Sequence, residues 1–234
     1  MDYQFVVEQL QSVLYADSLT RHPMTHTVNT PSETSIIFDS ISYNKAASII
    51  RMFEHALGSD KFQLALQEYI KLHEYTTSTP EKLFTALQRQ AEFDLVRYMT
   101  PWTTQSGYPV INVVIDKTTN MANVKQNRFL LKNENNANDK TLWDIPLTFA
   151  TKVADFENTK PLTYYTRLDA SGININLTSA PRSWTIFNVQ QTGYYRVNYD
   201  TAAWNDISVG LKKTNFDGIH VLNRAQVTLT YFAY

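Results

Sequence analysis

The spacing of the apolar residues changes twice along this chain of 234 residues, and that change limits the fold more than any other feature. Up to about residue 98, apolar residues recur at offsets of three and four, which is typical of amphipathic helices. From about residue 108 to 190, short β-branched runs alternate with polar turns, which is typical of strands. The helical spacing returns near Trp204. We therefore predict a multidomain α and β protein, with a β zone between two helical zones.

The first zone contains clear helix boundaries. An apolar stripe within residues 49–57 ends at Gly58, which suits a helix C-terminal cap. Asp60 is then placed to cap the next helix. Residues 78–81 combine a hydroxyl cap, a proline and an acid, which predicts the start of a third helix. By contrast, the stretch 20–34 is rich in Thr, Pro and His and predicts an extended loop.

The middle zone predicts a small antiparallel β-sandwich. Residues 108–115 form a β-branched run that ends in polar turn residues 116–120, so residues 121–131 are expected to return as the second strand of a hairpin. The further strand candidates are short and flanked by turn residues: 142–150, 164–168, 172–177 and 183–189. Several short strands at this spacing favour a sandwich.

The composition and the first residues of the chain exclude several classes of protein and of site. The 21 basic and 22 acidic residues give a net charge of −1, so no nucleic-acid partner is expected. The absence of cysteine excludes a disulfide framework, a thiol nucleophile and a thiolate metal site. The first residues have no basic and apolar regions of a signal peptide, and no apolar run approaches the roughly 18 residues of a membrane span. We therefore expect neither a signal peptide nor a transmembrane segment in this chain.

The histidines do not form a recognisable metal motif. A helical zinc site needs two histidines at i and i+4 with a glutamate after the first, and the pattern that begins at His73 has Thr77 in the second position. His22 and His26 have the right spacing, but Pro23 between them disfavours a helix. We therefore expect no metal ligands among these residues.

Two further features leave alternatives open. Asn176 begins an Asn-Leu-Thr sequon and is a candidate for N-glycosylation. Several aromatic residues of the middle zone could line a sugar site or fill the space between sheets, and we predict that they fill the core: Trp102, Tyr108, Trp143 and Trp184.

Four segments occur in order along residues 5–226. They are Asp-Ser-Leu-Thr-Arg-His-Pro at 17–23, Phe-Asp-Ser-Ile-Ser-Tyr-Asn-Lys-Ala-Ala-Ser at 38–48 with Arg-Met at 51–52, Trp-Thr-Thr-Gln-Ser-Gly-Tyr-Pro-Val at 102–110, and Gly-Tyr-Tyr-Arg-Val-Asn-Tyr-Asp at 193–200 with Asn-Arg-Ala-Gln at 223–226. In this order and spacing they resemble the zinc aminopeptidases of the aminopeptidase N type, a gluzincin metallopeptidase family.

The resemblance implies a division into three parts. Residues 1–98 resemble the helical end of a thermolysin-like catalytic domain, residues 99–190 a small antiparallel β-sandwich domain, and residues 191–234 the truncated start of an α-helical C-terminal domain. Such enzymes remove N-terminal amino acids from peptides with a zinc held by HExxH and a downstream glutamate, and use GxMEN for the substrate amine. Neither motif occurs in this sequence. The resemblance therefore implies a fragment that is inactive and binds no zinc alone, from a parent enzyme that is extracellular or at the cell surface.

The resemblance also assigns one catalytic residue. Tyr43 matches the tyrosine that stabilises the oxyanion of the tetrahedral intermediate. Ala46 departs from the glycine that is usual in the family, and its extra methyl group is expected to crowd a helix contact. After Gln226, the sequence Val-Thr-Leu-Thr-Tyr-Phe-Ala-Tyr predicts a strand or an exposed apolar tail rather than a helix.

Two function hypotheses follow. The first is a fragment of a zinc-dependent aminopeptidase that acts on peptide substrates only within the complete enzyme. The second is a non-catalytic β-sandwich binding module for a protein or glycan partner. Neither hypothesis fixes an oligomeric state.

Overall fold

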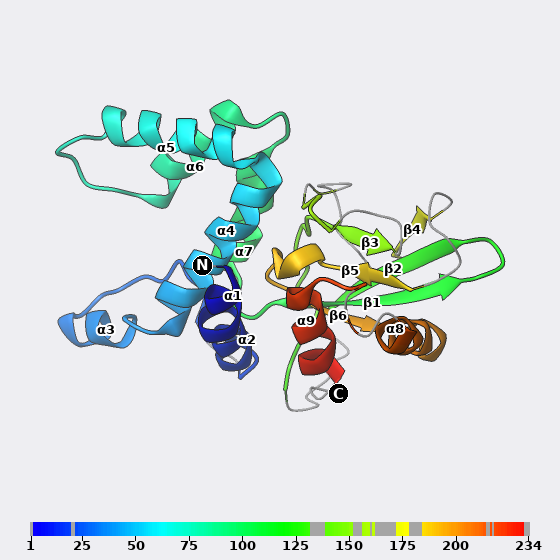
Figure 1. Ribbon diagram of the computed structural model, residues 1–234. Coiled ribbons are helices and arrows are strands. Elements are labelled where there is room, and N and C mark those ends of the chain that lie inside the picture. The colour runs from blue at the N-terminus through cyan, green and yellow to red at the C-terminus, as the bar shows by residue number, and fades with distance from the viewer. Residues whose placement is uncertain are drawn as a thin grey trace.

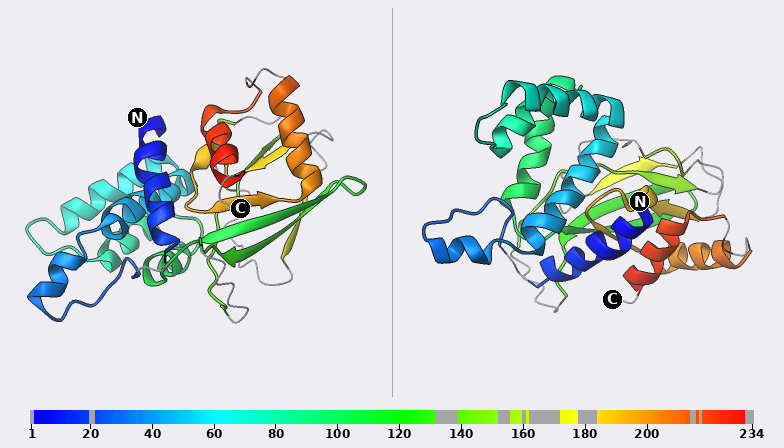
Figure 2. Two further views of the ribbon diagram at one scale, coloured as in Figure 1. Left: turned by 90° about the horizontal axis from the view of Figure 1, so that it is seen from below. Right: turned by 60° about the vertical axis from the view of Figure 1, so that its left-hand side comes forward.

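The computed structural model describes residues 2–19, 22–131, 139–151, 156–159, 161, 172–177, 184–213, 216 and 218–231. Within this part, the helices of the first hundred residues lie on one side and the strands on the other, with two late helices against the sheet (Figure 1). Helix α9 lies beside the N-terminal helix, as Figure 1 and Figure 2 both show, and the rings of Tyr3 and His220 have centroids 6.4 Å apart there. The predicted change from helix to strand and back to helix is confirmed.

The helices of the described residues begin with a continuous stretch of α1, η1 and α2, in which η1 is a π-helical segment. A second continuous stretch joins the π-helical η2 to α4. Their bounds are α1 Asp2–Gln4, η1 Phe5–Leu10, α2 Gln11–Asp17, α3 Pro31–Ile36, η2 Ile41–Lys45, α4 Ala46–Leu57, α5 Ser59–Leu72, α6 Pro80–Gln90, α7 Leu95–Thr104, α8 Thr201–Lys213 and α9 Val221–Tyr231, with a short 3₁₀ turn η3 at Val189–Gln191.

Local cap chemistry explains several of these boundaries. Gly58 ends α4 with a φ of 92°, a conformation that favours glycine, as predicted. Thr79 caps α6 by accepting a hydrogen bond from the backbone N–H of Lys82. The predicted cap at Asp60 is wrong, because α5 begins at Ser59 directly after Gly58 and has no side-chain cap.

The predicted loop 20–34 is wrong at its end, where α3 begins at Pro31. The side chain of Thr30 accepts a hydrogen bond from the backbone N–H of Glu33, and the proline occupies the first turn. This is the same hydroxyl–proline signal that starts α6 at Thr79, so the signal was present in the sequence.

The strands form a four-stranded sheet and a separate two-stranded sheet. The larger has the order β4-β2-β1-β6, and the smaller pairs β3 with β5. Their bounds are β1 Pro109–Asp116, β2 Met121–Arg128, β3 Phe149–Thr151, β4 Ile173–Asn176, β5 Thr185–Phe187 and β6 Arg196–Tyr199. The hairpin of β1 and β2 is confirmed, with Val113 opposite Val124.

The expectation of a purely antiparallel sandwich is wrong, because β6 runs parallel to β1. A parallel pair needs a long crossover, and residues 117–195 between these strands provide one. Strand β6 comes from residues that the sequence division placed beyond the sandwich, so the four-stranded sheet includes residues from both sides of residue 190. The division into three domains stays a prediction.

The strand predicted at 142–150 is also wrong for most of its length, since only Phe149–Thr151 forms a strand and residues 144 and 147 form isolated bridges. Residues 143–148 are buried, but Pro146 offers no backbone N–H for a ladder. The side chain of Gln126 takes the place of a strand partner: its amide donates to Trp143 O at 2.8 Å, and its oxygen accepts from Trp143 N at 3.0 Å. The strand predicted at 164–168 lies outside the described residues.

The strand or tail predicted after Gln226 is wrong, because α9 continues to Tyr231. Leu222, Gln226 and Thr230 are all buried at a spacing of four residues, so one helical face contacts the interior. Tertiary packing here overrides the β propensity of the Val-Thr-Leu-Thr sequence.

The four aromatic residues with an open sugar-site alternative belong to the core. Trp102, Tyr108 and Trp143 are fully buried, and Trp184 is 3% exposed. The rings of Trp102 and Trp143 have centroids 6.0 Å apart. The core interpretation is confirmed, and a sugar site lined by these residues is wrong.

We expect the buried tyrosines to make the fold sensitive to alkali. Burial raises the pKa of Tyr108, Tyr194, Tyr195 and Tyr199 above the ordinary value. The unfolded chain loses these protons above about pH 10 while the folded chain retains them, so stability falls by up to about 1.4 kcal/mol per pH unit for each residue. Absorbance and circular dichroism should therefore show their ionisation coinciding with unfolding. Full ionisation of all 14 tyrosines in a folded chain would contradict this.

Candidate functional site

Tyr43 lies in η2, the π-helical turn that leads into α4. Its side chain is 58% exposed, and its ring centroid is 6.2 Å from that of Phe38. Within the described residues, its hydroxyl group has no hydrogen-bond partner and is therefore available to a ligand.

Asp39 fixes the first turn that carries Tyr43. Its Oδ1 accepts hydrogen bonds from the backbone N–H groups of Ile41 at 2.9 Å and Ser42 at 3.1 Å. Its backbone oxygen accepts from the N–H of Tyr43 at 3.2 Å. These contacts satisfy N–H groups that otherwise lack partners at a helix start, so the backbone of Tyr43 is held while its side chain faces outward.

His22 holds the other oxygen of the same carboxylate. Its Nε2 is 3.1 Å from Asp39 Oδ2, and its Nδ1 is 2.8 Å from the carbonyl oxygen of Pro23. The two side chains are only 19% and 28% exposed. Asp39 therefore connects the segment after α2 to the turn of Tyr43.

Lys45 anchors the opposite end of η2 in the interior. Its Nζ lies 2.9 Å from Asp17 Oδ2, and both side chains are fully buried. Burial lowers the pKa of the Lys45 ammonium, and the nearby Asp17 carboxylate opposes that change. Such a pair is held in the interior only where further hydrogen bonds satisfy its remaining groups.

Those further hydrogen bonds join all four sequence segments of the resemblance. Asp17 Oδ1 accepts from the N–H of Gly107 at 3.0 Å, and Asp17 Oδ2 accepts from the hydroxyl of Tyr194 at 3.0 Å. Lys45 Nζ donates to the carbonyl oxygen of Gly107 at 2.9 Å. We call Asp17, Lys45, Gly107 and Tyr194 the junction cluster. It links the N-terminal helix, the turn of Tyr43, the entry to β1 and the entry to β6.

Ala46 has an ordinary helical backbone. It adopts φ −57° and ψ −47° and is only half-buried. Alanine adopts this conformation without strain, so the backbone at this position does not require a glycine. Crowding of a helix contact by its methyl group stays a prediction.

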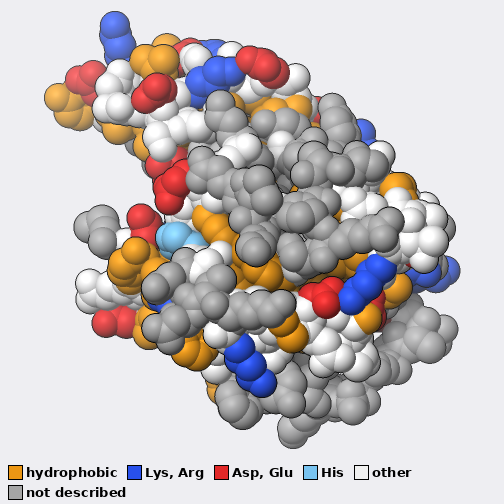
Figure 3. Space-filling view, turned by 45° about the vertical axis from the view of Figure 1, so that its right-hand side comes forward, with side chains coloured by type: hydrophobic (Ala, Val, Ile, Leu, Met, Phe, Trp, Pro, Cys, Tyr) orange, Lys and Arg blue, Asp and Glu red, His pale blue; other side chains and the backbone are white. Residues whose placement is uncertain are grey.

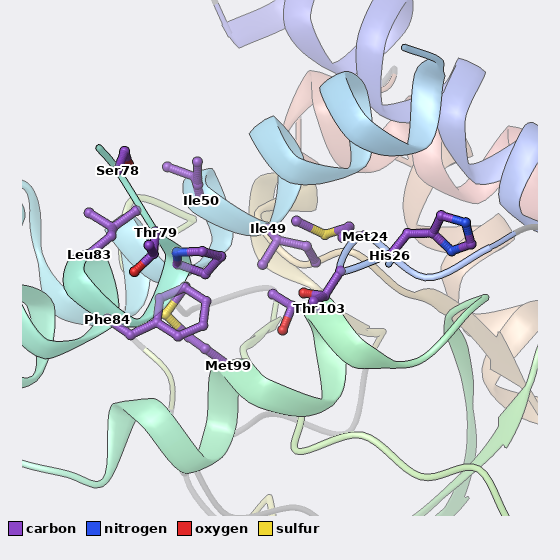
Figure 4. A pocket seen from close by; sticks show the side chains of 12 residues that line it. Met24, His26, Ile49, Ile50, Ser78, Thr79, Leu83, Phe84, Met99 and Thr103 are labelled. Carbon is purple, nitrogen blue, oxygen red and sulfur yellow. The ribbon is translucent and has the colours of Figure 1, made fainter. Parts of the chain in front are cut away.

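A groove of about 520 Å³ opens between α4, α6, α7 and the segment that follows His22 (Figure 4). Its wall is mainly apolar, with polar groups from three threonines, one serine and one histidine. The lining residues that Figure 4 labels are Met24, His26, Ile49, Ile50, Ser78, Thr79, Leu83, Phe84, Met99 and Thr103.

The described residues do not offer a zinc site. No three His, Asp or Glu side chains in these ranges lie close enough to hold a metal ion. His73 ends α5 with its ring centroid 5.4 Å from that of Tyr69. The rings of His22 and His26 also have centroids 5.4 Å apart, but His22 is engaged with Asp39. A complete set of three protein ligands for zinc is therefore not found among the described residues.

The glycosylation candidate Asn176 lies exposed at the end of β4, which is an edge strand of the larger sheet. Thr178, which completes the sequon, lies outside the described residues. Among the described helices, none has the length and apolar character of a membrane span. On the face shown in Figure 3, the described Lys and Arg side chains are dispersed among acidic and polar groups.

Sequence reasoning missed the junction cluster and the contact of His22 with Asp39. A signal for the first was present, because Lys45 stands between Ile41 and Ile49 at a spacing of four residues, where a helix buries apolar side chains. A lysine in such a stripe requires a buried partner. The identity of that partner depends on the fold, since Asp17 lies on another helix.

Comparison with known proteins finds relatives along nearly the whole chain. Residues 1–102 match the Peptidase family M1 domain. The chain is 38% identical, over 99% of its length, to the membrane alanyl aminopeptidase of Heliothis virescens, of which it covers 24%. It is 33% identical over 92% of its length to the glutamyl aminopeptidase of Bos taurus, of which it covers 22%. It is 35% identical over 96% of its length to the aminopeptidase N of Plutella xylostella, of which it covers 24%.

The chain thus spans about a quarter of the length of these curated relatives. The match to the first of these relatives covers 99% of this chain and so includes the four segments of the resemblance, which the junction cluster connects in this structure. The chain belongs to peptidase family M1, in the group of the aminopeptidase N type.

Proposed function

We propose that this chain is part of a zinc-dependent aminopeptidase that removes N-terminal amino acids from peptides, with Tyr43 as the donor to the oxyanion. The observation that carries the proposal is an exposed hydroxyl group on a turn that is anchored at both ends. Asp39 holds the start of the turn, and the buried pair of Lys45 and Asp17 holds its end. A donor fixed in advance is what stabilisation of a developing charge requires.

The chemistry suits a phenol. Attack of water on a peptide carbonyl moves negative charge onto the carbonyl oxygen, and the Tyr43 O–H would donate a hydrogen bond to that oxygen as the charge develops. The proton stays on the tyrosine, so the group acts as a hydrogen-bond donor. No group of three possible zinc ligands lies among the described residues, and the contribution that we propose for them is this donor.

The chain by itself is expected neither to bind zinc stoichiometrically nor to hydrolyse an aminoacyl-nitroanilide. Purified chain should be assayed for metal by mass spectrometry and for release of nitroaniline, beside its Tyr43→Phe variant. Background release should be the same for both proteins. Stoichiometric zinc would contradict the first expectation, and turnover that the substitution abolishes would show that the chain is an enzyme by itself.

The second hypothesis, a non-catalytic β-sandwich module, has weaker support. The aromatic residues proposed to line a sugar site are buried, so they do not support a glycan partner. A location outside the cell or at its surface, and glycosylation of Asn176, belong to the proposal for the complete enzyme. They are supported by a relative that is named a membrane alanyl aminopeptidase and by the exposure of Asn176.

A further inference from the structure

Both ring nitrogens of His22 face oxygen atoms. Nδ1 is 2.8 Å from the carbonyl oxygen of Pro23, and Nε2 is 3.1 Å from Asp39 Oδ2. A carbonyl oxygen and an ionised carboxylate accept hydrogen bonds and cannot donate them, while a neutral imidazole has only one N–H. Both contacts are hydrogen bonds only when the ring carries two protons. Loss of the Nε2 proton would leave a nitrogen lone pair facing the carboxylate.

The carboxylate of Asp39 divides its two oxygens between His22 and the turn of Tyr43. Oδ2 faces the imidazole, and Oδ1 accepts from the backbone N–H groups of Ile41 and Ser42 at 2.9 and 3.1 Å. A carboxylate is rigid, so a force on Oδ2 moves Oδ1 as well. A ring with one proton either turns a lone pair toward Oδ2, when the proton is on Nδ1, or donates there from an uncharged N–H, when it is on Nε2. Both interactions hold the carboxylate less firmly than the charged imidazolium does, so the hydrogen bonds at the start of the turn would be disturbed.

The ionisable groups around His22 in the described residues include His26, Glu33 and Asp39. The ring of His26 has its centroid 5.4 Å away, on the same segment. Glu33 of α3 interacts electrostatically with His26, and hydrogen bonds from Asn29 and Thr30 lower its pKa. The carboxylate of Asp39 is the acidic group that contacts the His22 ring directly.

We propose that His22 is a positioning residue whose protonation sets the turn that carries Tyr43. With both ring nitrogens protonated, His22 holds Asp39 in the geometry that caps the turn. After loss of one proton, the cap loosens and the hydroxyl of Tyr43 becomes less well fixed. The consequence for catalysis rests on the proposed role of Tyr43, whereas the coupling between the two residues does not.

The coupling can be measured by NMR on the 234-residue chain, without any substrate. A pH titration through the range in which the His22 ring changes protonation should follow its ring ¹⁵N signals together with the amide and ring signals of Tyr43. We expect the Tyr43 signals to shift with the same midpoint as those of His22. A His26→Gln variant is the matched control and should retain this coupling, since His26 does not contact Asp39 in the described structure.

Substitutions of His22 and of Asp39 test the direction of the coupling between His22 and Tyr43. In His22→Gln, the side-chain amide still donates to Asp39 but does not titrate, so the shift of Tyr43 in this pH range should be lost. In Asp39→Asn, the side-chain amide donates to an unprotonated Nε2, so the turn should be held when His22 is neutral and the shift should reverse its sign. Dispersed amide signals verify that each variant is folded.

The inference is overturned if the Tyr43 signals do not follow His22 in the unmodified chain, or if they still shift fully in His22→Gln. It also fails if the sign in Asp39→Asn is unchanged. The proposed function fails by a different result, namely full activity of the complete enzyme with Tyr43→Phe. Coupling observed together with that activity would support the inference and refute the function.

Discussion

In the complete enzyme, Tyr43→Phe is expected to lower kcat by about 10²–10³, the usual effect of removing one oxyanion donor. The substitution removes a single oxygen atom from a side chain that is 58% exposed, so the fold should not change. KM should change little, because the lost hydrogen bond strengthens only as charge develops in the transition state. Steady-state kinetics with a peptide and an aminoacyl-nitroanilide measure both quantities.

Tyr15→Phe is the matched control for this experiment. Tyr15 lies on α2 and is also 58% exposed, so the two variants lose the same atom at the same exposure. The control should keep kcat unchanged. Equal kcat values for Tyr43→Phe, Tyr15→Phe and the unmodified enzyme would refute the role of Tyr43. A higher KM of Tyr43→Phe with an unchanged kcat would instead indicate a role in substrate binding.

Asp17→Ala is expected to lower the free energy of unfolding of the chain by about 3–5 kcal/mol. The variant leaves the ammonium group of Lys45 buried without its carboxylate, and both side chains are fully buried in the native chain. The N–H of Gly107 and the hydroxyl of Tyr194 lose their acceptor at the same time. Urea unfolding followed by circular dichroism measures the change.

Three controls separate charge from hydrogen bonding and burial. Asp17→Asn keeps an oxygen for Gly107 and should lose less stability than Asp17→Ala. The double change of Asp17→Leu and Lys45→Met removes both charges and should lose less than the sum of its single changes. Asp206→Ala breaks an exposed pair with Lys117 and should change stability by about 1 kcal/mol or less. An equal loss for Asp17→Ala and Asp206→Ala would refute the argument from burial.

The sequence predicted best what depends on neighbouring residues. The end of α4 at Gly58 and the start of α6 at Thr79 each follow from a few adjacent side chains, and the hairpin of β1 and β2 follows from one polar turn. The parallel position of β6 could not be predicted this way, because its partner β1 lies about eighty residues earlier. Likewise, α9 is helical because of what its buried face contacts, and its own propensities indicate a strand.

The candidate site likewise contains one residue that the sequence identified and others that it did not. The family motif drew attention to Tyr43, whose role is chemical and tied to one residue type. The motif also contains Lys45, but its partners Asp17 and Tyr194 lie on other segments, so spacing along the chain does not reveal them. The contact of His22 with Asp39 crosses 17 residues and an intervening helix, and no periodicity indicates it.

The junction cluster also orders events during synthesis. The hydrogen bond between Tyr194 and Asp17 spans 177 residues of sequence. At about 5–20 residues per second, a ribosome needs roughly 9–35 s to make the chain between them. Throughout that interval the carboxylate of Asp17 lacks one of its final partners, although Lys45 and Gly107 are already made. The set of contacts around Asp17 is therefore completed only after Tyr194 has been made.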